Sequence, residues 1–204
     1  MMGYYLRILS PSDQNISYSE LQTALHADHP MAMLSLEEES DTDWRQLLLS
    51  HGDGTEIAVV ERNSSDEGLG ASEIQEFLEE IADGRPKSAA VWLKDYLSRI
   101  RAIYALQLLS GTEVAGGWTI LGSIKNAIWR KAGGIFQADR EGFSNEDGYH
   151  ILWQFSDSVS GNWWMGVIEN GAWVHFEMDL GNPQHREAFF AGNVPAGVVR
   201  TLPL

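Results

Sequence analysis

Four side chains near the C-terminal end of the sequence could carry chemistry because they occupy alternate positions: Trp173, His175, Glu177 and Asp179. Alternate residues of a β-strand lie on one face of a sheet, so this spacing puts an imidazole between an indole and a carboxylate. A neighbouring carboxylate can shift the pKa of a histidine so that it lies near neutral pH, and it can orient the imidazole as a general base. The more common arrangement with this spacing is a half-exposed sheet face on which His175 and Glu177 satisfy each other or are covered by a helix.

A turn signal predicts the strand that holds these residues. The dipeptide Asn170-Gly171 lies between two alternating runs, 162–169 and 172–179. Both residue types tolerate positive φ, so the dipeptide predicts a two-residue hairpin loop. That loop length fixes the register. One face is then apolar and pairs Val167 with Val174, Met165 with Phe176 and Trp163 with Met178; the other face is mixed and pairs Ile168 with Trp173, Gly166 with His175 and Trp164 with Glu177.

We expect the apolar face to lie in a core, and we take the mixed face as the candidate binding surface, with Trp164, Trp173, His175 and Glu177 as its binding residues. Six of the eight tryptophans follow residue 110, and large aromatic side chains dominate both cores and binding anchors. The mixed face therefore either packs under a helix or binds something. The sequence leaves both readings open.

Other clusters offer weaker chemistry. The loop 139–148 is rich in carboxylates, as calcium and magnesium sites are, but its spacing does not match an EF-hand loop. The segment His26-Ala-Asp28-His29 offers three metal ligands without a pairing of the HExxH type. The sequence also lacks a nucleophile elbow and a dinucleotide fingerprint. We expect no metal site, no cofactor and no identifiable catalytic residue, and we lean toward a protein that is not an enzyme.

The negative charge is concentrated in one segment. The chain carries a formal net charge of −15, and the segment from Asp28 to Asp83 holds sixteen carboxylates against only Arg45 and Arg62. Affinity for nucleic acid comes from cations that displace counterions, so we expect this segment not to bind nucleic acid. A basic protein partner would be steered toward it. The alternative is that the acidic surface only keeps the protein soluble.

Composition predicts a folded protein of the cytoplasm. The 204 residues are 44% hydrophobic, enough for a full core, and there is no cysteine, which excludes disulfides and thiolate zinc sites and fits a reducing compartment. The N-terminus does not read as a secretory signal. The longest apolar stretch, 88–109, contains Lys94, Asp95, Arg99 and Arg101. We therefore expect no membrane span.

Hydrophobic periodicity predicts three successive sections. The first is a β-α-β-β-β pattern, with strands over 4–9, 31–36, 44–49 and 56–61 and a helix that starts at the capping box Ser17 to Glu20. The second is helical, with helices from Ser72 to about Gly84, over 88–109, and from about Trp118 to Gly134. The third is a meander of strands over 135–139, 149–155, 163–169 and 172–178, followed by a short helix at 183–191.

This order predicts an α+β fold, in which an antiparallel sheet with the Asn170-Gly171 hairpin packs against the helical section. We treat residues 1–204 as a single α+β domain. The polar loop 63–70 is the best candidate boundary, and it would divide the chain into a β-rich section, 1–63, and a section of helices and antiparallel sheet, 71–204. The sequence does not predict an oligomeric state.

Two functions from different classes remain. The first is a non-catalytic interaction protein of bacterial type that binds a protein partner, in particular a basic one, through the acidic segment, the Trp164/Trp173 face, or both. Its format, an acidic, cysteine-free α+β domain without catalytic signatures, is similar to that of the immunity proteins that neutralise bacterial toxins, although no motif carries this resemblance. The second is a small-molecule enzyme or ligand-binding domain with a pocket at Trp173, His175 and Glu177.

Overall fold

The structure, a computed structural model, describes residues 3–36 and 40–201 and has the predicted α+β fold. The chain divides into two compact units that each use two stretches of sequence. Unit 1 comprises Met1–Ala71 and Ile100–Gly134, and unit 2 comprises Ser72–Arg99 and Ile135–Leu204. No helix of the described residues is long and apolar enough to cross a membrane.

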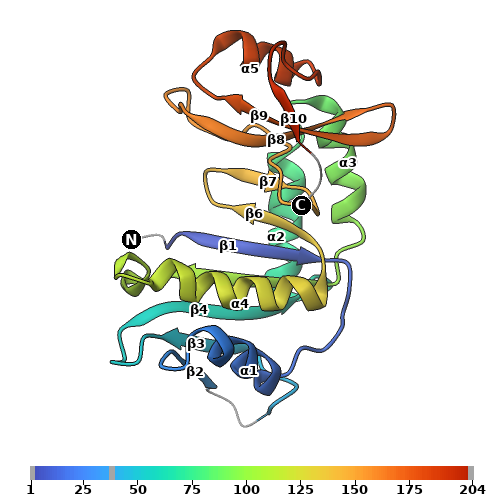
Figure 1. The fold of residues 1–204 in the computed structure, drawn as a ribbon. Helices are drawn as coiled ribbons and strands as arrows, with labels where there is room; N and C mark the ends of the chain where they lie inside the picture. The colour runs from blue at the N-terminus through green and yellow to red at the C-terminus, as the bar shows by residue number, and fades with distance from the viewer. Residues whose placement is uncertain (1–2, 37–39, 202–204) are drawn as a thin grey trace. The chain divides into compact units, whose positions relative to one another are not determined.

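Unit 1 is built on five antiparallel strands in the order β2-β3-β4-β5-β1. Figure 1 shows α4 running across one face of this sheet with α1 beside it, and the two helices contact each other. The predicted capping box is present at the start of α1, where Glu20 N–H donates to Ser17 Oγ and Ser17 N–H donates to Glu20 Oε2. The elements of unit 1 are β1 (Tyr5–Ser10), α1 (Tyr18–Asp28), β2 (Met33–Leu36), β3 (Gln46–Ser50), β4 (Glu56–Ser64), β5 (Ala102–Leu108), the 3₁₀ helix η1 (Ser110–Glu113) and α4 (Gly117–Ala132).

Unit 2 contains the predicted hairpin. Strands β8 and β9 pair antiparallel, and the short strand β10 adds to the free side of β9. A second hairpin, β6–β7, precedes them in the chain. Helix α2 starts in unit 1 and continues into unit 2. The elements are α2 (Gly68–Glu80), α3 (Lys87–Leu97), β6 (Ile135–Ala138), β7 (Gly142–Ser144), β8 (Asn162–Glu169), β9 (Ala172–Asp179), α5 (Pro183–Phe190) and β10 (Val199–Thr201).

The predicted helix over 88–109 is wrong in its second half. Helix α3 ends at Leu97, and residues 102–108 form β5, which pairs with β4 on one side and with β1 on the other. A strand in the middle of a sheet that is buried on both faces shows a continuous apolar run instead of alternation. Residues 102–106 are all buried. Their uninterrupted apolar run therefore continued the helical pattern of α3 in the sequence.

The predicted strand over 149–155 is also wrong. Within this segment only His150 makes β-bridges, one to Ser144 and one to Met165. Other backbone groups of the segment bond to separate parts of unit 2: Ile151 N–H donates to the Phe143 carbonyl, and Trp153 N–H donates to the Arg85 carbonyl. The alternation that suggests a strand therefore belongs to an irregular segment.

The hairpin itself forms in the predicted register. Asn170 and Gly171 have φ values of 53° and 82°, as a turn with two left-handed residues requires, and the three apolar pairs lie opposite each other as expected. Met165, Val167, Phe176 and Met178 are buried together with Phe189 of α5 and neighbouring apolar residues. The apolar face of the hairpin is therefore the core of this part of unit 2.

Replacing Gly171 with Val should destabilise the protein by about 1 to 3 kcal/mol, because a β-branched residue is strained at positive φ. Nothing lies within 4 Å of an added Cβ at this position, so the cost comes from the backbone and not from a clash. Urea denaturation measures the change. Asn170→Gly is the matched control and should be close to neutral, since glycine accepts the same φ; equal losses in both variants would contradict the turn assignment.

Candidate functional site

The mixed face of the hairpin extends over three strands, because β10 continues it beyond β9. Residues that lie directly opposite each other share a face, and this arranges the face in rows. The outer row holds Trp164, Glu177 and Val199; the middle row holds Gly166, His175 and Thr201; and the inner row holds Ile168 and Trp173. The three rows differ in what covers them.

The middle row is covered by the loop that follows β7. The Tyr149 ring stacks on the His175 ring with centroids 4.0 Å apart and planes 14° apart, and Thr201 Oγ1 donates to Tyr149 Oη at 3.1 Å. Gly166 leaves room beneath the imidazole, since an added Cβ there would lie 3.3 Å from His175 Cδ2. As a result only 3% of His175 is exposed.

Asn145 fixes the tautomer of the buried imidazole. Its Oδ1 accepts the backbone N–H groups of Asp147 and Tyr149, at 3.1 and 3.0 Å, so its Nδ2 faces His175. That nitrogen lies 2.8 Å from His175 Nε2 and must donate to it. The neutral imidazole then carries its proton on Nδ1, and the Nε2 lone pair that a general base would use is already occupied.

Burial lowers the pKa of His175, because desolvation disfavours the imidazolium. The carboxylate of Asp147, 3.5 Å from Nε2, acts in the opposite direction and raises it. Within the described parts of the chain, no hydrogen bond joins His175 to Glu177. The structure thus places the two predicted residues on one face without making them an acid–base pair.

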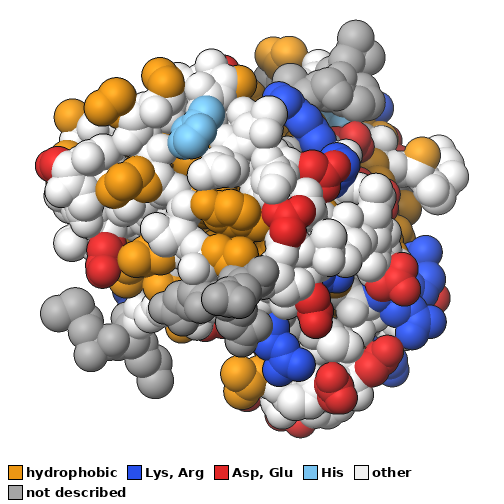
Figure 2. Space-filling model, turned by 90° about the horizontal axis from the view of Figure 1, so that it is seen from below, with side chains coloured by type: hydrophobic (Ala, Val, Ile, Leu, Met, Phe, Trp, Pro, Cys, Tyr) orange, Lys and Arg blue, Asp and Glu red, His pale blue; other side chains and the backbone are white. Residues whose placement is uncertain are grey.

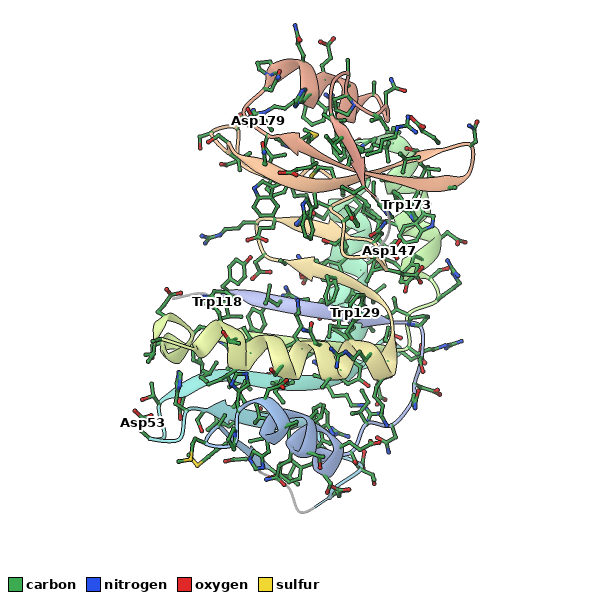
Figure 3. All side chains as sticks on the ribbon, viewed as in Figure 1. Asp53, Trp118, Trp129, Asp147, Trp173 and Asp179 are labelled. Atoms are coloured by element: carbon green, nitrogen blue, oxygen red, sulfur yellow. The ribbon has the colours of Figure 1, made fainter. Side chains whose placement is uncertain are left out.

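The inner row is covered by helix α3. The Trp173 ring meets the Trp92 ring edge to face, with centroids 5.1 Å apart, and Trp92 stacks in turn on Tyr96. Tyr96 Oη donates to Glu146 Oε1 at 3.3 Å, and burial raises the pKa of this phenol. Trp173 is therefore half-buried in an aromatic cluster of unit 2. Figure 3 shows Trp173 and Asp147 in this part of the molecule and Asp179 at the other end of the β8–β9 ribbon.

The outer row remains open. Trp164 is 49% exposed and Val199 is 72% exposed, with the half-buried Glu177 between them. The Trp164 ring stacks on Tyr149 at a centroid distance of 6.0 Å. We call these three residues the open row. Of the four predicted binding residues, the structure leaves Trp164 and Glu177 accessible, partly covers Trp173 and buries His175.

The remaining sequence candidates have local structural roles. Asp179 Oδ1 accepts the backbone N–H groups of Gly161 and Gly181, at 3.2 and 2.8 Å, and so closes the loops at the end of β9. His26, in the last turn of α1, contacts the Ala32 carbonyl. Across the described residues, no group of three or more His, Asp or Glu side chains is placed to hold a metal ion.

Sequence reasoning missed the residues that decide which part of the face is open. The alternation over 149–155 predicts a strand for Tyr149, and Asn145 stands in the sequence only as a member of a carboxylate-rich loop. The strand β10 was not predicted at all, because three residues are too few for a periodic pattern. The turn Asn145 to Gly148 was the one available signal, since asparagine commonly bonds the backbone two residues later.

The acidic segment does not form part of a single unit. Eleven of its sixteen carboxylates belong to unit 1 and five to unit 2, so that the two units have similar net charges of −7 and −8. Glu37, Glu38 and Glu39 lie outside the described residues. Other members make local bonds: Asp41 accepts from Ser19, and Asp53 from the Thr55 N–H. Figure 2 shows one face on which acidic and basic side chains lie beside each other.

Comparison with known proteins returned no match: no protein-family model, no curated protein and no solved structure is significantly similar to the chain.

The Trp92–Trp173 contact should contribute measurably to stability. Trp173→Ala should cost roughly 2 to 3 kcal/mol of unfolding free energy, less than for a fully buried tryptophan, because part of its surface stays in water. In a double-mutant cycle with Trp92→Ala, the double variant should lose about 1 kcal/mol less unfolding free energy than the sum of the losses in the two single variants. Strictly additive losses in urea denaturation would show that the edge-to-face contact carries no coupling.

His150 should make the protein less stable in mild acid. Its Nδ1 is buried and has no hydrogen-bond partner among the residues that the structure describes. Its ring packs on Phe155 and Trp163, and burial lowers its pKa to about 4. The unfolded chain binds this proton below pH 6.5, whereas the folded protein binds it only near pH 4, so stability falls as the pH decreases through that window. The loss should reach about 2 kcal/mol at pH 5.

A comparison of His150→Leu with the wild type measures this contribution. The difference in unfolding free energy between the two proteins should change by about 2 kcal/mol from pH 7.5 to pH 5, in favour of the variant. His26→Leu is the control, because His26 is exposed on the surface of α1. Parallel pH profiles for the wild type and His150→Leu would rule out the buried neutral imidazole as the cause.

Proposed function

We propose that the chain is a non-catalytic protein that binds a protein partner through the open row Trp164, Glu177 and Val199. The observation that carries the proposal is an exposed indole that stacks on a tyrosine, in one row with the exposed Val199 across Glu177, on a face whose other two rows are covered. Tryptophans on a rigid surface are typical binding hot spots, because they bury a large apolar area and lose little freedom on binding.

The charges around this row favour a basic partner. Glu177 belongs to the row itself, and the Asp147 side chain, beside the middle row, is 39% exposed. Unit 2 as a whole carries fifteen carboxylates against seven basic side chains. Complementary charge increases the rate of encounter and selects between partners more than it adds affinity. A basic toxin or a nucleic-acid enzyme is a partner of this kind, and the immunity proteins offer the analogy of format.

The burial of His175 supports a binding role over a catalytic one. A general base must reach the substrate proton directly or through one water molecule. Here the Nε2 lone pair is bonded to Asn145 and the ring lies under Tyr149. The pocket alternative at Trp173, His175 and Glu177 would require the loop of Asn145 and Tyr149 to move away. The lack of cysteine fits a cytoplasmic site of action, which we include in the proposal.

Trp164→Ala should abolish the capture of the partner by the purified, tagged protein from extracts of its native host. Trp118→Ala is the matched control, because Trp118 is 52% exposed at the start of α4 in unit 1 and lies at the other end of that helix from Trp129 (Figure 3). The affinity for the partner should fall roughly tenfold or more in Trp164→Ala and stay unchanged in Trp118→Ala.

Salt and folding distinguish the possible causes of a loss. Raising NaCl should slow association, as expected for an acidic protein that meets a basic one. The melting temperature of each variant checks that the fold is intact, and Val199→Glu provides a second change in the open row that leaves the indole in place. Equal capture by the wild type and by both open-row variants would overturn the proposal.

A further inference from the structure

Unit 1 contains a polar cavity that gathers three arginines in an acidic protein. The cavity has a volume of about 620 Å³, within the usual range for small-molecule sites. Arg45 and Arg62 line it, and they are the only basic residues of the segment from Asp28 to Asp83. Arg101 joins them from another part of the chain. The two cations of the acidic segment are therefore concentrated at one place.

Sheet topology explains why the three side chains meet. Gln46 of β3 pairs with Glu61 of β4, and Arg62 N–H donates to the carbonyl of Arg45, which directly precedes β3, at 2.9 Å; the two arginines therefore lie opposite each other. Arg101 directly precedes β5, where Ala102 pairs with Ser64 of β4. Because the strands are antiparallel, the starts of β3 and β5 and the end of β4 lie side by side at the same end of the strands.

Among the described residues, most hydrogen-bond donors of these guanidinium groups have no acceptor. Arg62 Nη1 donates to two neutral acceptors, the amide oxygen of Asn15 at 2.6 Å and the Thr42 carbonyl at 3.5 Å. Within the described residues the Arg101 guanidinium has Asp66 as its one partner, at 3.6 Å, in an exposed ion pair that is too long for a hydrogen bond. In the part of the chain that the structure describes, no carboxylate lies within ion-pair distance of Arg45. Like charges directly opposite on a sheet destabilise it unless something lies between them.

The same cavity is lined by three carboxylates, Asp13, Asp43 and Glu67. Among the described residues they form no ion pair with the three arginines, so both signs of charge are available to a ligand. Asn63 and Ser64 add neutral polar groups to the lining. The composition of the cavity suits a small polar molecule better than an apolar one or a bare anion.

We propose that this cavity binds a small polar compound through an oxyanion, a phosphate or carboxylate group held by Arg45, Arg62 and Arg101. Guanidinium groups form paired, charge-assisted hydrogen bonds to both oxyanions, and these are stronger than bonds between neutral groups. The carboxylates of the lining then accept from hydroxyl or amine groups of the same molecule. The site lies in unit 1 and does not depend on the open row of unit 2.

Isothermal titration calorimetry of the full chain at pH 7 with inorganic phosphate, pyrophosphate and succinate tests the proposal and distinguishes phosphate from carboxylate. At least one of the three should bind with one-to-one stoichiometry. Arg45→Gln should weaken that binding roughly tenfold or more. Arg130→Gln is the control, an exposed arginine near the end of α4 in the same unit that does not line the cavity, and should leave binding unchanged.

The stability of the unliganded protein separates binding from structure. Because Arg45 has no ion-pair partner and faces Arg62, Arg45→Gln should leave the melting temperature unchanged or raise it, and should remove the increase in melting temperature that the bound probe gives the wild type. Arg62→Lys keeps the charge but loses paired bonding, and should also weaken binding. Absence of saturable binding for all three probes, or equal affinity in wild type and Arg45→Gln, would overturn the proposal.

Discussion

The register of the β8–β9 hairpin is the constraint on which the arrangement of unit 2 depends. A slip of one residue would move every side chain of both strands to the opposite face, because the side-chain period of a strand is two. Met165, Val167, Phe176 and Met178 would then leave the core, and Trp164 would enter it. The left-handed backbone of Asn170 and Gly171 fixes the loop at two residues. The turn thus determines both what is buried and what is offered to solvent.

The opposite face shows how a buried polar group can order a surface. Burying an imidazole costs free energy unless it is hydrogen-bonded, and Asn145 supplies the bond while its own oxygen orders the turn that follows β7. That turn places Tyr149 against His175, and Tyr149 in turn supports Trp164. His175 looks catalytic in the sequence, but its role here is structural. Through Tyr149 it supports the exposed Trp164, which lies two residues before Gly166, the cross-strand partner of His175.

The parts of the fold that the sequence predicted are those set by local chemistry. The hairpin, the Ser17 capping box and the end of α4 at Gly133 each depend on residues a few positions apart, and each is found where expected. The prediction for the residues of β5 is wrong, because their apolar run indicates burial on both faces and does not distinguish a strand from a helix. The covering of His175 could not be predicted either, since Tyr149 reaches it from an irregular loop that has no period to detect.

The distribution of charged residues along the sequence does not predict where charges gather in the folded protein, because long-range contacts decide which residues become neighbours. The segment from Asp28 to Asp83 reads as one acidic block, yet its carboxylates belong to two units, and one of them, Asp66, forms an ion pair with Arg101 from a later part of the chain. Arg45 and Arg62, seventeen positions apart, look like isolated exceptions in that block. Antiparallel pairing of β3 with β4 makes them neighbours. Arg101 joins them because it directly precedes β5, the strand whose sequence predicts a helix. A cluster of cations that is assembled by long-range strand pairing cannot be detected in a short window of sequence, because its members lie far apart along the chain.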